Sequence, residues 1–167
     1  MNPTHPMNTP ENRYPSPDLL KIDPRMARLL CRAYYDELET ISTYIYNGIL
    51  LEKSCTPLAK LYESIAMTEM RHFRLIGQSI RCLGGNHAIR TDLRIGVPDL
   101  ALCAPQSRID AVAKQTLRAA VTSEQTAAWE YRALADKTRD DTLREILRRL
   151  ACDEEEHARL FAEFGGY

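Results

Sequence analysis

Two Glu-x-x-His motifs stand out among the residues whose types and spacing could do chemistry. They begin at Glu69 and Glu154, and each sets a carboxylate and an imidazole on one face of a helix. A lone glutamate precedes each motif at a similar distance, since Glu69 follows Glu37 by 32 residues and Glu154 follows Glu124 by 30. Carboxylate oxygens and imidazole nitrogens bind divalent metals. The predicted metal ligands are Glu37, Glu69, His72, Glu124, Glu154 and His157.

Each of these side chains takes a position where a core leucine is expected. In residues 56–84, for example, Ile65, Glu69, His72 and Ile76 lie on one otherwise apolar stripe. The other three helical segments carry the same kind of interruption. The helical phase turns three other glutamates away from the core: Glu39, Glu155 and Glu156.

Four carboxylates inside one core need compensation, because each buried charge without a partner costs several kcal/mol, to order of magnitude. No lysine or arginine shares these stripes at this level. Two divalent cations would balance four ionised glutamates. Tyr44 and Tyr131 follow Glu37 and Glu124 by seven residues, and two interpretations stay open: hydrogen-bond donors to metal ligands, or amphipathic core residues.

Helix boundaries are marked by capping residues, prolines and glycines. Asp23-Pro24 and Thr56-Pro57 each place a capping side chain before a proline and predict two helix starts. Gly84-Gly85 and Gly165-Gly166 predict two helix ends. The predicted helices are at about residues 24–53, 56–84, 107–137 and 141–164.

These elements predict an all-α fold, an antiparallel four-helix bundle made of two helical hairpins. The link from Gly84 to Gln106 is long enough to return along the whole bundle, so it is expected to be a crossover. The predicted domain covers residues 23–167. Residues 1–22, rich in Pro, Asn, Thr and Ser, are expected to form a disordered or loosely attached tail.

Composition excludes several classes of partner and site. The net charge of −1 gives no reason to expect nucleic acid or anionic lipid, and no apolar run has the length of a membrane span, so a cytoplasmic protein is expected. No two of the five cysteines have the spacing of a zinc or iron–sulfur knuckle, and they are interpreted as buried small hydrophobic residues. Trp129 is interpreted as a packing residue, and His5 and His87 as residues without a role.

At the proposed ligands the sequence resembles the rubrerythrin branch of the ferritin-like superfamily, whose diiron domain uses a glutamate, a Glu-x-x-His, a second glutamate and a second Glu-x-x-His. That order matches over about residues 24–164. The strings that agree are Glu37 with Tyr44 and Tyr46, Glu69-Met70-Arg71-His72, and Asp153-Glu154-Glu155-Glu156-His157. The resemblance implies a ferritin-like bundle that holds two iron ions.

This chain departs from the rubrerythrins at two points. Rubrerythrins typically carry a rubredoxin domain with paired Cys-x-x-Cys motifs, which are missing here, so a reductive site would take electrons from a separate donor protein. Many rubrerythrins also have a carboxylate three residues after the glutamate of the third helix, and here that residue is Ala127.

The function expected from the resemblance is a non-haem diiron oxidoreductase that reduces H2O2 or O2 at a carboxylate-bridged site. Glu69 and Glu154 are expected to bridge the ions, and the other four ligands to complete the two coordination spheres. Three alternatives stay open: manganese catalase-like dismutation, a non-catalytic metal-binding or assembly protein, and a zinc or purely structural site. Self-association, for example as a dimer, is also left open.

Overall fold

The computed structural model describes residues 14–86 and 106–166, and the side chains of the second range from residue 110 onward. It contains a short 3-10 helix, η2 (Pro17–Leu19), and four α-helices. These are α1 (Pro24–Leu51), α2 (Thr56–Cys82), α3 (Gln106–Lys137) and α4 (Asp141–Gly165). No strand occurs in the ranges just given. The predicted all-α fold and its four helices are confirmed.

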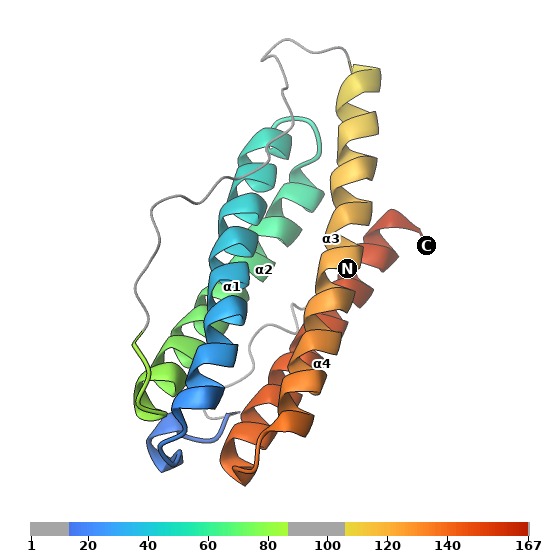
Figure 1. The fold of residues 1–167 in the computed structure, drawn as a ribbon. Coiled ribbons are helices and arrows are strands. Elements are labelled where there is room, and N and C mark those ends of the chain that lie inside the picture. The colour runs from blue at the N-terminus through green and yellow to red at the C-terminus, as the bar shows by residue number, and fades with distance from the viewer. Residues whose placement is uncertain (1–13, 87–105, 167) are drawn as a thin grey trace.

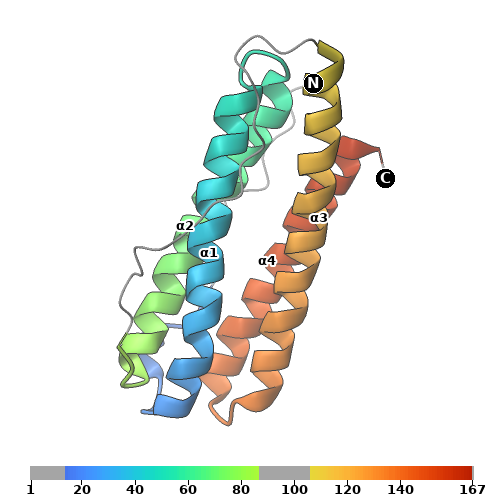
Figure 2. The ribbon, with the colours of Figure 1, turned by 45° about the horizontal axis from the view of Figure 1, so that its top comes forward.

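The helices form two antiparallel hairpins, α1 with α2 and α3 with α4 (Figure 1). Figure 2 shows the two hairpins side by side, with α2 and α3 running in the same direction. A chain that joins two parallel helices must return along the bundle, which agrees with the predicted crossover. The crossover itself, residues 87–105, lies outside the described residues, as do His5, His87 and Cys103.

Of the two predicted helix N-caps, that of α1 is confirmed and that of α2 is wrong. Asp23 caps α1, since its carboxylate accepts hydrogen bonds of 3.1 Å from the backbone N–H groups of Arg25 and Met26. The prediction that Thr56 caps α2 is wrong. Its hydroxyl donates to the carbonyl oxygen of Glu52 at 2.9 Å, and the helix begins at Thr56 itself.

Two glycines end the hairpins as expected. Gly84, just after α2, has φ +82°, and Gly166, just after α4, has φ +71°. A left-handed residue lets the backbone leave a helix while its last carbonyl groups still accept hydrogen bonds. The N–H of Gly166 donates to the carbonyl of Glu163 at 3.2 Å.

The apolar core is divided into two clusters, one toward each end of the bundle. One lies where α1 begins and α2 ends, and it includes Leu30, Ile76, Ile80, Leu143 and Leu147. The other lies where α1 ends and α2 begins, and it includes Leu51, Leu58, Ile65, Leu117 and Phe161. All of these side chains are buried. The middle of the bundle, between the two clusters, holds the buried glutamates and histidines of the core.

The described part of the predicted tail, residues 14–22, contacts the bundle. Leu20 is buried, and the N–H of Lys21 donates to the carboxylate of Asp140 at 3.1 Å. Directly afterwards the N–H of Asp23 donates to the carbonyl of Leu83 at 3.0 Å. This segment, with η2, therefore packs against both α2 and α4.

Two other expectations concern the surface. Cys31, Cys55 and Cys82 are half-buried and Cys152 is exposed, so the interpretation of these cysteines as buried residues is wrong. Trp129 is also largely exposed, at 68%, and is not a packing residue. Within the described ranges, none of the helices combines the length and the apolar character needed to cross a membrane.

Candidate metal centre

The six predicted ligands meet in the middle of the bundle. Glu37 comes from α1, Glu124 from α3, and α2 and α4 each supply one Glu-x-x-His pair. None of the six is more than 5% exposed. Their atoms form two overlapping groups with metal-ligand spacing. One group is Glu37, Glu69, His72 and Glu154, and the other is Glu69, Glu124, Glu154 and His157.

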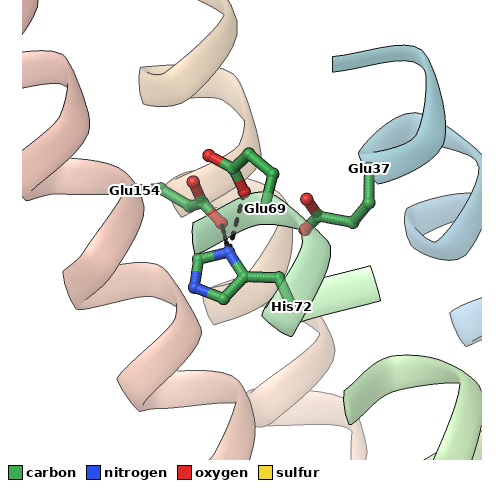
Figure 3. A group of neighbouring side chains, drawn as sticks. All are labelled: Glu37, Glu69, His72 and Glu154. Carbon is green, nitrogen blue, oxygen red and sulfur yellow. Dashed lines mark hydrogen bonds and ion pairs between the residues drawn. The ribbon is translucent and has the colours of Figure 1, made fainter. Parts of the chain in front are cut away.

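The first group, called here the His72 position, is drawn in Figure 3. Nδ1 of His72 lies 2.8 Å from Oε2 of Glu69 and 3.0 Å from Oε1 of Glu154. Glu37 extends from α1 toward the same carboxylates (Figure 3). Three helices thus direct four ligands to one point.

The second group, the His157 position, repeats this arrangement. Nδ1 of His157 lies 2.8 Å from Oε1 of Glu69, 3.2 Å from Oε2 of Glu154 and 3.6 Å from Oε2 of Glu124. Glu69 and Glu154 therefore each direct one oxygen to each imidazole. This pseudo-twofold arrangement places both carboxylates between two ligand sets.

The two tyrosines noted in the sequence donate hydrogen bonds to ligands. The hydroxyl of Tyr44 on α1 donates to Oε1 of Glu124 on α3, and that of Tyr131 on α3 donates to Oε1 of Glu37 on α1. Each tyrosine is thus paired with the glutamate of the other hairpin. Burial raises the pKa of both hydroxyls, and the nearby carboxylate adds to that rise, so they stay donors.

Glu37 and Glu124, which each belong to only one of the two ligand groups, favour the protonated form. Burial raises the pKa of Glu37 well above its usual range, and the charges of Glu69 and Glu154 raise it further. Burial likewise raises the pKa of Glu124, again with Glu69 adding to the effect. Burial, reinforced by the charges of the neighbouring carboxylates, is the reason that Glu37 and Glu124 do not easily ionise.

Glu69 and Glu154, which belong to both ligand groups, favour the ionised form, and the two histidines favour the imidazolium form. Burial opposes the ionisation of Glu69, but His157 and His72 outweigh it and its pKa is lowered. The pKa of Glu154 is also lowered, against burial and the charge of Glu69, by His72 and by hydrogen bonds from both rings. Burial opposes the imidazolium forms, yet the carboxylates raise the pKa of both histidines well above 6.5. The protein's own groups thus balance their charges by holding protons.

The donor set fits a metal better than it fits protons. Each Nδ1 carries at most one hydrogen, yet each faces at least two carboxylate oxygens within 3.2 Å. Among the described residues, Oε1 of Glu69 and Oε1 of Glu154 are buried within 3.0 Å of an imidazole Nδ1, yet neither contact has the geometry of a hydrogen bond. A cation accepts several such ligands at once, whereas a proton serves one acceptor.

A groove leads to the centre from the surface between α1 and α3. It has a volume of about 880 Å³ and is lined mainly by small and polar side chains, among them Thr40, Ser123 and Ala127. Glu69 and Glu154 form part of its lining. The groove therefore reaches the ligands from this face.

The glutamates excluded by helical phase point away from the centre. Glu39 and Glu155 are exposed, and Glu155 forms an ion pair with Arg132 on the surface. Glu156 forms an ion pair with Arg159, at 2.6 Å.

Sequence reasoning missed two residues that contact a ligand. Oδ2 of Asp153 lies 3.4 Å from Nε2 of His72, and the hydroxyl of Tyr14 lies 3.3 Å from the same nitrogen. Asp153 appeared only as part of a family string, and Tyr14 fell in the predicted tail. Two features of the sequence could have indicated them. Asp153 directly precedes the second Glu-x-x-His motif, and Tyr14 lies two residues before Ser16, the residue that caps η2.

Comparisons with known proteins bear on these residues. A family model described as Rubrerythrin matches residues 115–166, which include Glu124, Glu154 and His157. Over this part of its length the chain is similar to the rubrerythrin family. A bacterioferritin structure from Rhodobacter capsulatus, described as having a metal-free dinuclear site and haem iron, matches with a TM-score of 0.71 and 25% identity. The match covers 88% of this chain and 87% of the bacterioferritin, and it confirms the ferritin-like fold. No curated protein matches.

Proposed function

We propose that this rubrerythrin-like chain binds two iron ions and is a non-haem diiron oxidoreductase that reduces H2O2 or O2. One observation carries the proposal: Glu69 and Glu154 belong to both ligand groups, so each carboxylate can bridge two ions. Bridging carboxylates hold two metals about 3.5–4 Å apart, which suits a substrate that must accept two electrons. The family and fold comparisons support iron as the metal.

The residues of the chain have separate tasks in this proposal. His72 and His157 would hold one ion each through Nδ1, the nitrogen that faces the carboxylates. Glu37 and Glu124 would complete the two positions, kept in orientation by the hydroxyls of Tyr131 and Tyr44. The bound ferrous pair would supply two electrons to the oxidant.

The surroundings suit a small oxidant. The groove between α1 and α3 gives H2O2 or O2 a route to the centre, and the apolar clusters on either side keep the rest of the bundle core dry. Where many rubrerythrins have a further carboxylate, Ala127 lines this groove instead. Electrons for another turnover would come from a separate donor protein.

The test is to load the chain anaerobically with ferrous iron, add one equivalent of H2O2 and follow the near-ultraviolet absorption of the oxidised centre. The proposal expects rapid oxidation of both ions without evolution of oxygen. Oxygen evolution by a manganese-loaded sample alone would favour catalase-like dismutation. Iron that binds but does not react with either oxidant would favour a storage, carrier or assembly role.

A further inference from the structure

The imidazole of His72 has a second pair of partners on the side away from the carboxylates. Nε2 lies 3.4 Å from Oδ2 of Asp153 and 3.3 Å from the hydroxyl of Tyr14. The hydroxyl of Tyr14 also donates to Oδ2 of Asp153. These contacts connect α2, α4 and the N-terminal segment at one nitrogen of a proposed metal ligand.

Tyr14 reaches this place because the segment that follows it is fixed to the bundle. Ser16 caps η2, Leu20 is buried, and the backbone N–H of Lys21 donates to the carboxylate of Asp140 at the start of α4. The ring of Tyr14 packs edge-on to the imidazole of His72, with ring centroids 6.4 Å apart at 78°. Tyr14 thus covers His72 on the side of α2 and α4, whereas the groove opens the centre between α1 and α3.

The aspartate of this arrangement has no acidic counterpart in the other Glu-x-x-His motif. In α4 the residue before Glu154 is Asp153, whereas in α2 the residue before Glu69 is Thr68, which carries no charge. The pseudo-twofold repeat of the ligands therefore does not extend to the residue that precedes each motif. A carboxylate and a tyrosine thus lie within 3.4 Å of Nε2 of His72, whereas the position in α2 that corresponds to Asp153 is the uncharged Thr68.

We propose that Tyr14 is a positioning residue that makes the two metal positions inequivalent, an inference that rests on the proposed metal-binding function. The Asp153 carboxylate at Nε2 keeps the proton on that nitrogen and leaves the lone pair of Nδ1 for the cation. The hydroxyl of Tyr14 holds the Asp153 carboxylate in orientation for this task. The His72 position is therefore the tighter of the two.

The expected change in metal affinity can be estimated from hydrogen-bond partners of metal ligands in general. Loss of such an outer partner of a metal ligand weakens metal binding by roughly 10–100-fold. Tyr14→Phe keeps the aromatic ring and removes only the hydroxyl, so we expect the smaller value, about 10-fold, at the His72 position alone.

The experiment is an anaerobic titration of the full chain with cobalt(II), followed by the visible absorption of the bound ion. The wild type should bind two ions in two steps of unequal affinity. Tyr14→Phe should weaken the tighter step and shift its absorption band, while leaving the weaker step unchanged. Tyr44→Phe is the matched control, since that hydroxyl contacts Glu124 at the other position and its loss should change the weaker step.

A double-mutant cycle tests the route through Asp153. In an Asp153→Asn background, Tyr14→Phe should have almost no further effect, whereas Tyr44→Phe should keep its full effect. Two ions bound by Tyr14→Phe with both steps as in the wild type would overturn the inference and leave the proposed function standing. A wild type that binds no cobalt would overturn the proposed function as well.

Discussion

The protonation pattern of the centre predicts how many protons the chain releases when it binds metal. Four groups hold protons that metal ligands cannot keep. They are the carboxyls of Glu37 and Glu124, whose pKa is raised by burial, and the rings of His72 and His157, whose pKa is raised by the carboxylates against burial. Ligation requires an ionised carboxylate or a free ring nitrogen.

The magnitude follows directly from these four groups. One proton leaves each of them, so two bound ions should displace up to four protons per chain near neutral pH. Glu69 and Glu154 contribute none, because their pKa is already lowered. Since protons compete with metal, affinity should fall steeply as the pH falls.

The assay is titration calorimetry with cobalt(II) at about pH 7 in two buffers that differ in ionisation enthalpy. The difference in the observed heat gives the number of protons passed to the buffer. We expect the fully loaded chain to release more than one proton and at most four. Two bound ions with fewer than about one proton released would refute the reasoning, because ligands of another kind would then hold the metal.

The same four groups also make the stability of the metal-free fold depend on pH. Metal affinity should fall as the pH falls, whereas this stability should fall as the pH rises. The folded-state pKa of His72 and His157 lies above 6.5, so their stabilisation is complete below that pH and is lost as the pH rises through the folded value. The raised pKa of Glu37 and Glu124 acts in the same direction above about 4.5. With a chelator present, thermal unfolding followed by circular dichroism should therefore occur at a lower temperature at about pH 9 than at about pH 6.5.

Three further predictions concern single residues. Glu124→Ala should lose at least one metal ion, whereas Glu155→Ala, at the surface of the same bundle, should retain both. Metal analysis after gel filtration would measure this, and equal losses would contradict the helical phasing. In the metal-free protein, Glu69→Gln should lower the free energy of unfolding by about 3–5 kcal/mol, because it leaves imidazolium charge uncompensated. Glu37→Gln replaces a neutral acid and should lower it by about 1 kcal/mol or less. Urea unfolding of both variants would measure the difference. Gly85→Ala should cost roughly 1–3 kcal/mol in the same assay, since a methyl group there would lie 2.6 Å from the nearest side-chain carbon; unchanged stability would mean that the helix ends separate easily.

The helices and the convergence of the six side chains could be predicted because both follow from local patterns. Glu69 and His72 take positions in an apolar stripe, and an interrupted stripe indicates a polar cluster in the core wherever the helices meet. The similar distance from each lone glutamate to its Glu-x-x-His motif indicated that both halves of the chain contribute to one site. That these residues bind metal stays a prediction.

The contacts that depend on the relative placement of distant segments could not be predicted. The pairing of Tyr44 with Glu124, rather than with a residue of its own hairpin, is set by how closely α1 and α3 approach. Tyr14 lies in a proline-rich segment without a helical pattern, so nothing local indicated that it reaches His72. Trp129 was misjudged because a large aromatic residue on a helix does not reveal by itself which face it occupies.

Metal content after anaerobic reconstitution is the most direct test of the central claim. The chain would be incubated with excess ferrous iron, freed of loosely bound ions by gel filtration and analysed for iron per chain. We predict two iron ions in the wild type. One ion or none, with the chain folded as judged by circular dichroism, would contradict a dinuclear centre at Glu69 and Glu154.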